Sequence, residues 1–317
     1  MVVNLQVEVG SVALSNPILA ASGTFGFGPE YGALVHLGRL GGIAVKGVSP
    51  VPWPGNPPPR VWETEGGMLN SIGLQNPGVE AFCRDDLPFL REQGTRVVVN
   101  VIGRTIDEYC QVVERLESEP GVDALELNIS CPNIKEGGMS FGQDPEHAGA
   151  VTAAVRSCTK RPLWVKLSPN VADPAAIAAA VEQAGADAIT AINTVVGMAI
   201  DLKRRRPALG GISGGLSGPA IKPIALRVVY QVAQAVSIPI VGMGGIRSAQ
   251  DVAEFLMAGA SAVMVGTATF AEPGVMERII EELPLCLNRL DVSSPVELIG
   301  AALPGSGSVE GKDRVRS

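Results

Sequence analysis

The sequence contains few of the residues that build histidine sites, metal centres and disulfide frameworks. It has two histidines and five cysteines in 317 residues, and no two cysteines are spaced as C-x-x-C. Scattered cysteines argue against a disulfide framework, a structural zinc site or an iron–sulfur cluster held by this chain, so we expect no metal site. His36 lies in a stretch that predicts a helix, and His147 lies at a predicted helix start. A histidine base therefore has little support.

Long apolar runs and an excess of positive charge are also lacking. No run of about 18 apolar residues occurs, and the first residues do not show the basic and apolar segments of a secretory signal. The formal net charge is -7, and the one basic run covers residues 203–206. We expect that run to be a solvated loop. The composition predicts a cytoplasmic protein that binds neither nucleic acid nor a membrane.

Short apolar runs alternate with amphipathic stretches from about residue 17 to residue 270. This alternation is typical of βα units around a parallel sheet, whose buried strands are apolar throughout. Eight such runs are the number that closes an α/β fold of the (β/α)8 or TIM-barrel type. We expect one barrel domain over residues 1–304 and a disordered polar tail over 305–317. The runs are residues 17–22, 42–47, 96–102, 123–129, 163–168, 187–193, 238–243 and 261–266.

Helix signals lie between the runs. Thr105 and Asp173 precede amphipathic stretches as helix caps, and Gly185 and Gly259 occupy positions typical of helix C-caps. Two connections are longer than a helix and a turn require, at residues 49–76 and 195–218. Long βα loops in a barrel usually build or cover the site.

Polar residues close most of the apolar runs. Catalytic groups in such barrels lie at the carboxyl ends of strands, and buried amides and lysines are costly without partners. A ligand rich in hydrogen-bonding groups explains the set, although any one member could be satisfied by neighbouring backbone. Lys166 could place a positive charge beside a flavin or form an ion pair within the barrel. The residues are Ser22, Lys46, Asn100, Asn128, Lys166, Asn193 and Thr194.

The last two runs end in glycine-rich segments. Gly244-Gly245 and Gly266-Thr267 follow the seventh and eighth runs, where barrels commonly bind phosphate through backbone N–H groups. The pattern indicates a phosphorylated ligand. It does not distinguish a phosphorylated substrate from flavin mononucleotide (FMN).

Cys131 lies just past the end of the fourth run, in a loop that contains Pro132. A free cysteine is often an inert core residue, but this position within a polar set favours a catalytic role. A thiol with an ordinary pKa of about 8.5 can act as a base near neutral pH if its surroundings favour the thiolate. Lys46 could contribute to that effect.

These motifs together resemble the catalytic subunit of class 1 dihydroorotate dehydrogenase, in the type B form that works with an electron-transfer subunit. The resemblance covers nearly the whole chain. Its most specific elements are Lys46-Gly47, residues 70–78 (NSIGLQNPG), residues 128–133 (NISCPN), Asn193-Thr194, Gly244-Gly245 and Gly266-Thr267.

The resemblance implies an FMN enzyme that oxidises (S)-dihydroorotate to orotate in the synthesis of UMP. Cys131 would be the catalytic base that removes the proton from C5, while the hydride leaves C6 for the flavin. The FMN would be held by Ser22, Lys46, Gly47, Asn100, Asn128, Lys166, Ile192, Gly218, Gly244, Gly245, Gly266 and Thr267. The dihydroorotate would be held by Lys46, Asn70, Ser71, Ile72, Gly73, Leu74, Asn128, Asn193 and Thr194.

The electron acceptor follows from the same resemblance. It implies NAD as the final oxidant and a partner subunit that carries FAD and a [2Fe-2S] cluster, in a heterotetramer of two catalytic and two electron-transfer subunits. The chain has no G-x-G-x-x-G between a strand and a helix for a dinucleotide of its own. A type A homodimer that reduces fumarate directly is the alternative that the residues leave open.

Two more distant interpretations remain. The flavin domain of dihydropyrimidine dehydrogenase shares the barrel and the N-x-S-C-P cysteine, but has a histidine where this chain has Asn133, and Lys46 would then lack a substrate carboxylate. A barrel without a redox role could use the glycine loops for a substrate phosphate. That role would leave Cys131 and the asparagines unexplained.

Overall fold

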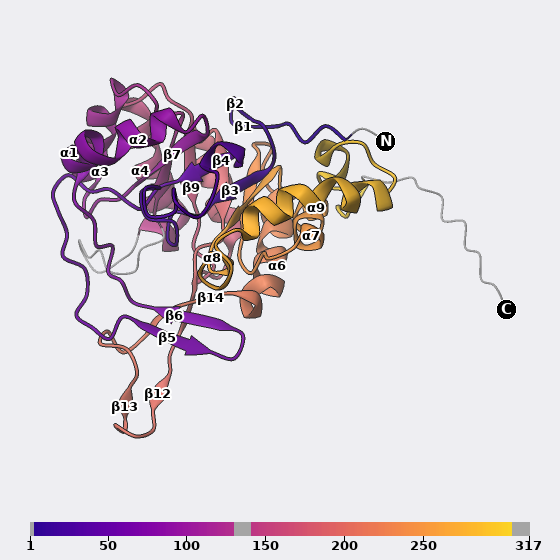
Figure 1. The fold of residues 1–317 in the computed structure, drawn as a ribbon. Coiled ribbons are helices and arrows are strands. Elements are labelled where there is room, and N and C mark those ends of the chain that lie inside the picture. The colour runs from indigo at the N-terminus through magenta and orange to yellow at the C-terminus, as the bar shows by residue number, and fades with distance from the viewer. Residues whose placement is uncertain (1–2, 130–140, 306–317) are drawn as a thin grey trace.

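The computed structural model describes residues 3–129 and 141–305, which form a closed barrel of parallel strands surrounded by helices (Figure 1). The strands follow one another around the barrel in sequence order, and the last pairs with the first. Each predicted apolar run contains one barrel strand, so the (β/α)8 fold is confirmed. The strands are β3 (Ile18–Ala20), β4 (Gly42–Ala44), β7 (Arg96–Val101), β8 (Ala124–Asn128), β9 (Leu163–Lys166), β10 (Ala188–Ala191), β15 (Ile240–Met243) and β16 (Ala262–Val265).

Four of the outer helices begin at side-chain caps. Thr105 accepts a hydrogen bond from the backbone N–H of Glu108, and Asp173 accepts from two backbone N–H groups, which confirms both predicted helix starts. The α-helices are α1 (Val79–Ala81), α2 (Leu87–Glu92), α3 (Ile106–Glu117), α4 (Pro145–Ser157), α5 (Pro174–Gln183), α6 (Lys222–Ala233), α7 (Ala249–Met257), α8 (Ala268–Ala271) and α9 (Val275–Arg289). A π-helical turn, η2 (Phe82–Asp86), joins α1 to α2, and the 3-10 helices are η1 (Leu37–Arg39), η3 (Phe141–Gln143), η4 (Pro219–Ile221) and η5 (Pro295–Leu298).

The helix predicted around His36 is wrong. Turns occupy the preceding residues, and His36 itself lies just before η1. Gly32 and Gly38 weaken a helix in this stretch, because glycine loses the most backbone freedom on ordering. His147 lies in the first turn of α4, as expected.

An amino-terminal hairpin closes one end of the barrel. Strand β1 (Val7–Val9) pairs antiparallel with β2 (Val12–Leu14), and its inner side chains join Trp164 and Met264 in one buried cluster. The turn of the hairpin packs against the backbone of Asp187, which directly precedes β10. The hairpin therefore seals the end where the barrel strands begin.

The two long loops pair with each other at the other end. They form one antiparallel sheet in the order β11-β14-β6-β5, which joins segments far apart in the sequence. The loop after β4 supplies β5 (Val61–Thr64) and β6 (Gly67–Asn70). The loop after β10 supplies β11 (Val195–Gly197) and β14 (Gly214–Ser217).

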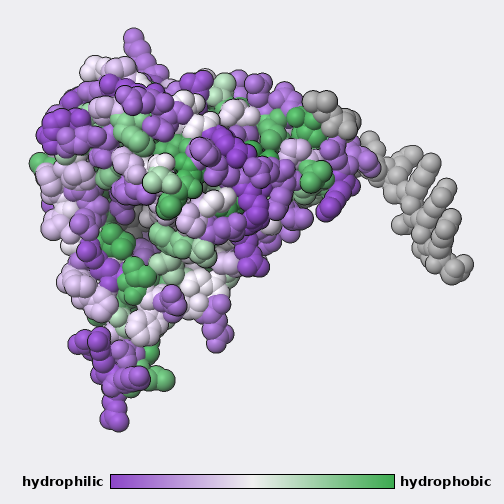
Figure 2. Space-filling model, viewed as in Figure 1, coloured by the Kyte–Doolittle hydropathy of each residue, from purple (hydrophilic) through white to green (hydrophobic). Residues whose placement is uncertain are grey.

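A second hairpin projects from this sheet (Figure 1). It consists of β12 (Ile200–Asp201) and β13 (Arg206–Pro207), and its tip carries the basic run 203–206, which is exposed as predicted. Leu202 beside the run is 84% exposed. Figure 2 shows this tip as a largely hydrophilic projection with hydrophobic residues at its base.

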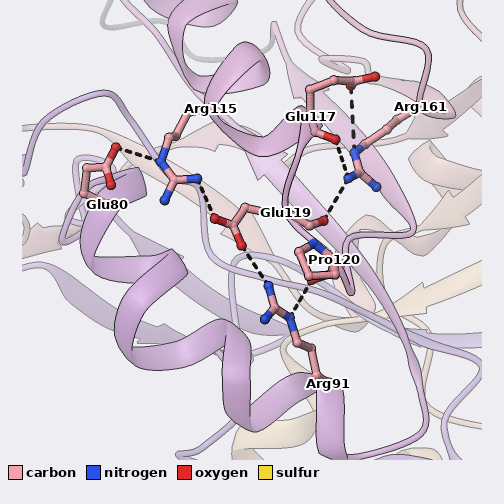
Figure 3. Close-up of polar contacts among 7 residues, drawn as sticks. All are labelled: Glu80, Arg91, Arg115, Glu117, Glu119, Pro120 and Arg161. Atoms are coloured by element: carbon pink, nitrogen blue, oxygen red, sulfur yellow. Dashed lines mark hydrogen bonds and ion pairs between the residues drawn. The ribbon is translucent and has the colours of Figure 1, made fainter.

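An ion-pair network braces the turn that leads into β8 (Figure 3). Arg115 of α3 binds Glu80 and Glu119, at 2.8 and 2.6 Å. Arg91 of α2 binds Glu119 at 2.8 Å and donates to the carbonyl oxygen of Pro120. The network stands at the amino end of the barrel, away from the polar strand ends.

Some of the expectations fall on residues that lie outside the described ranges. Residues 130–140, which include Cys131, and 306–317 are among them. The division into a domain at 1–304 and a tail at 305–317 therefore stays a prediction. Within 3–129 and 141–305, no helix is long and apolar enough to cross a membrane.

Candidate active site

A cavity of about 920 Å³ opens at the carboxyl ends of the barrel strands. Its size is in the range of sites that enclose a cofactor-sized ligand. Residues from both long loops and from the ends of β9, β10, β15 and β16 contribute to its wall. Ten residues that the sequence singles out line it: Asn70, Lys166, Ile192, Asn193, Thr194, Gly218, Gly244, Gly245, Gly266 and Thr267.

Three of these glycines have backbone conformations that other residues rarely adopt. Gly218, Gly244 and Gly245 have φ angles of 103°, 130° and 76°. A Cβ at Gly244 would lie 2.7 Å from the Cβ of Ala225, and one at Gly245 would lie 2.9 Å from the carbonyl oxygen of Gly218. Glycine is therefore required by the fold here, and it leaves the backbone open to a close ligand.

Gly266 differs from the other three. A Cβ there would meet no protein atom closer than 3.6 Å, so packing alone does not require a glycine. The cavity that Gly266 lines gives the reason, because a side chain would occupy ligand space. Beside it, Thr267 donates from Oγ1 to Ser217 Oγ at 2.7 Å, which ties the end of β16 to β14.

Lys166 is a buried charged residue that lines the cavity. It ends β9, is 5% exposed, and donates from Nζ to Ser22 Oγ at 3.0 Å. Strands β9 and β3 are not neighbours, so this bond crosses the barrel. The Nζ also lies 3.7 Å from the Oε2 of buried Glu126. Lys166 therefore forms an ion pair within the barrel and also lines the cavity, and its place beside a flavin stays a prediction.

Two predicted asparagines extend this polar group. Asn100 donates from Nδ2 to Glu126 Oε2 at 2.5 Å, and Asn128 donates from Nδ2 to Asn100 Oδ1 at 3.4 Å. The hydroxyl of Tyr109 donates to the carbonyl oxygen of Asn128 at 2.8 Å. Neither asparagine is among the residues that line the cavity, and both connect to Lys166 through Glu126.

Lys46 follows β4 and stands near Lys166. Burial, the charge of Lys166 and the charge of Arg60 together hold the pKa of Lys46 below its ordinary value. Gly47 next to it allows a close approach, since a Cβ there would lie 2.8 Å from Asn100 Oδ1.

The predicted substrate loop follows β6. Asn70 lines the cavity and donates from Nδ2 to the carbonyl oxygen of Gly215 at 3.3 Å. Ser71 Oγ accepts from Asn56 Nδ2 at 2.9 Å, which fixes the loop from outside. The remaining loop residues do not line the cavity in this structure: Ser71, Ile72, Gly73 and Leu74.

Asn193 and Thr194 follow β10, beyond the buried Ile192. The Oδ1 of Asn193 accepts from the backbone N–H of Thr194 at 2.8 Å. Asn170 braces the same segment: its Nδ2 donates to the carbonyl oxygen of Thr194 at 3.0 Å, and its Oδ1 accepts from the N–H of Val196 at 2.9 Å. Asn170 therefore holds both sides of the turn that presents Asn193 and Thr194.

Comparisons with known proteins agree with this geometry. The family model described as dihydroorotate dehydrogenase matches residues 4–287. A protein of Alkaliphilus metalliredigens named dihydroorotate dehydrogenase B (NAD(+)), catalytic subunit, is 53% identical over 94% of this chain and 99% of its own length. A protein of the same name from Bacillus pumilus is 53% identical over 93% of this chain and 96% of its own length. The chain belongs to the dihydroorotate dehydrogenase family.

The family assignment makes the chain an oxidoreductase and implies that it binds a flavin. A solved structure of a dihydroorotate dehydrogenase from Eimeria tenella, in complex with ferulenol, superimposes with a TM-score of 0.80. The superposition covers 94% of this chain and 88% of the Eimeria tenella chain. At 22% sequence identity, it supports the fold alone. The catalytic-subunit name of the bacterial relatives implies a partner subunit for them.

The residues of the cavity fit a flavin mononucleotide. Gly244, Gly245 and Gly266 form a cradle without side chains, which suits a phosphate approached by backbone N–H groups. Lys166 supplies a fixed positive charge in the lining of the cavity, which suits a ring system that gains negative charge on reduction. The alternatives without a flavin, or with a pyrimidine-reducing role, are not favoured.

Glu126 and Ser217 are among the residues around this site that the sequence interpretation did not single out. Glu126 is hydrogen-bonded to one predicted residue and ion-paired with another, yet the sequence interpretation gave it no role. Its position two residues before Asn128 places both on the same face of β8, which is the signal that could have found it. Ser217, which lines the cavity, directly precedes the predicted Gly218.

Proposed function

We propose that this chain oxidises (S)-dihydroorotate to orotate in UMP biosynthesis, with FMN as its flavin and Cys131 as its base. One observation carries the proposal: three kinds of residue line the same cavity. They are glycines suited to a phosphate, a buried lysine, and three strand-end or loop residues suited to a pyrimidine. Those three residues are Asn70, Asn193 and Thr194.

The chain's own residues would divide the work. Asparagine amides and Thr194 would hydrogen-bond the pyrimidine ring, and Lys46 would hold its carboxylate. The four-stranded sheet would shield the reacting carbons from water. FMN supplies the hydride acceptor when it is bound. Cys131 would take the proton from C5, so that one C–H bond is lost as a proton and the other, at C6, as a hydride.

Electrons would leave through a second subunit. We propose that this subunit carries FAD and a [2Fe-2S] cluster, that it passes electrons to NAD, and that two copies of each subunit form a cytoplasmic heterotetramer. The NAD in the names of the relatives supports this scheme over fumarate reduction. The described part of this chain contains no group of three potential metal-ligating side chains, so the cluster is assigned to the partner.

An anaerobic absorbance experiment tests the proposal. The purified chain, loaded with FMN, should lose its oxidised-flavin absorbance when dihydroorotate is added and should not respond to dihydrouracil. A Cys131→Ser variant should bind FMN equally and be bleached at least about 100-fold more slowly at neutral pH, because a positioned general base contributes about 10²–10⁴-fold.

Three outcomes would contradict parts of the proposal. A flavin that stays oxidised with dihydroorotate would reject the substrate, and failure to bind FMN at all would reject the cofactor. An unchanged bleaching rate in Cys131→Ser would reject the base assignment alone.

A further inference from the structure

Glu126 is a charged side chain in the middle of the barrel that the proposed function does not use. It is completely buried, and it lies on β8 between the two strands that carry its partners. Its Oε2 accepts from Asn100 on β7 and lies 3.7 Å from Lys166 Nζ on β9. Its Oε1 has no hydrogen-bond partner among the residues that the structure describes.

Stability alone does not explain this carboxylate. A buried ion pair must offset the cost of removing both charges from water, and replacing such a pair by apolar side chains is often neutral or stabilising. Apolar side chains fill the neighbouring inward positions: Ala124 and Val98 lie two residues earlier on their strands, and Trp164 of β9 pairs in register with Glu126 itself. An apolar layer was therefore available, and the barrel holds two opposite charges here instead.

Access separates the two charges. Lys166 lines the cavity, whereas Glu126 has no exposed surface and does not line it. Glu126 can therefore influence a ligand in two ways, by fixing where the ammonium lies and by balancing its charge. Ser22 holds the same ammonium from across the barrel, at 3.0 Å, but a neutral hydroxyl cannot balance it.

We propose that Glu126 is a positioning residue for Lys166 and that its negative charge lowers the reduction potential of the flavin in the cavity. This inference rests on the proposed FMN site. Reduced flavin carries more negative charge than oxidised flavin, so an unbalanced Lys166 would favour the reduced form. With Glu126 in place, that preference is restrained and reduced flavin gives up its electrons more readily.

Glu126→Gln tests the inference, because it removes the charge and keeps a group that can accept from Asn100. The ratio of the affinities for reduced and oxidised FMN should rise about tenfold, as expected for one charge lost within about 10 Å at an effective dielectric constant of about 20. For a two-electron couple this is a rise of about 30 mV in the reduction potential. The potential is measured by equilibrating the FMN-loaded protein with a reference dye, without dihydroorotate.

Two control variants accompany it. Glu126→Asp keeps the negative charge on a shorter side chain. Its affinity ratio should stay within threefold of the wild-type ratio, and this expectation can be checked even if Glu126→Gln folds poorly. Glu119→Gln removes a carboxylate held by two arginines at the far end of the barrel (Figure 3) and should leave the ratio unchanged.

The outcomes separate this inference from the proposed function. Glu126 has only a structural role if Glu126→Gln binds FMN with an unchanged affinity ratio. The same conclusion follows if Glu126→Asp shifts the ratio as much as Glu126→Gln does. If the wild-type chain itself binds no FMN, the proposed function fails and takes this inference with it.

Discussion

Lys46, the proposed partner of the substrate carboxylate, has a pKa shifted by its surroundings. Its folded pKa lies below the unfolded value of about 10.5, because burial and the charges of Lys166 and Arg60 oppose protonation. Between the two pKa values the unfolded chain holds more protons than the folded chain, so the contribution of Lys46 to the free energy of unfolding rises with pH across that window. An anionic ligand that pairs with Lys46 has the opposite preference, because it needs the protonated amine.

We therefore predict that orotate affinity falls as the pH rises through a midpoint below 10.5. Titrating the FMN-loaded protein with orotate at several pH values, by the change in flavin absorbance, measures the midpoint. Lys46→Met should bind orotate weakly at every pH and should lack this step. An affinity in the wild type that stays constant up to pH 10.5 would contradict a role for the Lys46 charge.

Single residues were predictable where the strand period and strand ends define them. Lys166, Asn193 and the glycine pair at 244–245 follow from the rule that barrel sites lie at carboxyl strand ends. Glu126 was missed because it lies inside strand β8, two residues before the strand-end residue Asn128. An apolar side chain is the usual expectation at such a position. Its partners come from neighbouring strands, and no local pattern announces them.

At the scale of elements, the β1–β2 hairpin is expected to matter for stability and not for ligand binding. Leu14 is 1% exposed and packs in the cluster that fills the amino end of the barrel. The cavity lies at the other end, and no residue of the hairpin lines it. The hairpin should therefore contribute to folding without contributing to ligand binding.

Leu14→Ala is expected to lower the free energy of unfolding by about 2–5 kcal/mol, through lost burial and the space left behind. Urea denaturation measures the loss, and FMN titration should give an affinity within threefold of the wild type. A variant of normal stability, or one that loses FMN affinity while folded, would contradict this separation.

The elements of the barrel could be read from the sequence, but the sheet over the site could not. Each barrel strand lies in a largely apolar run with a cap or glycine nearby, and such signals are local. The loop sheet joins Asn70 to Gly215 across 145 residues, and its strands are half-exposed and rich in glycine. Long connections indicated that something covers the site, and only the structure gives their pairing.

The whole molecule is half of the proposed redox system. Its described residues enclose one large cavity at the strand ends, and the sequence lacks a dinucleotide-binding motif of its own. In the proposed scheme, electrons from dihydroorotate pass from the flavin to the partner subunit and from there to NAD. The relatives' designation as a catalytic subunit is consistent with that division.

We predict that dihydroorotate bleaches the flavin bound to the isolated chain, but that no NADH forms when NAD is added. Adding a purified electron-transfer subunit should restore continuous NADH formation, followed by its absorbance. A chain that is first heat-denatured serves as the control for the partner's own activity. Sustained NADH formation by the isolated chain would show that no partner is needed.

The closure of β16 onto β3 also sets when the protein can first become active during its synthesis. Strand β3 ends at residue 20, but its neighbour β16 begins only at residue 262. In the loop sheet, β6 ends at residue 70 and its partner β14 begins only at residue 214. A ribosome must therefore release most of the chain before the barrel can close and the sheet over the cavity can form. A product truncated before β16 would expose open strand edges and lack the Gly266 side of the cavity, so incomplete chains are targets for aggregation and proteolysis rather than partly working enzymes.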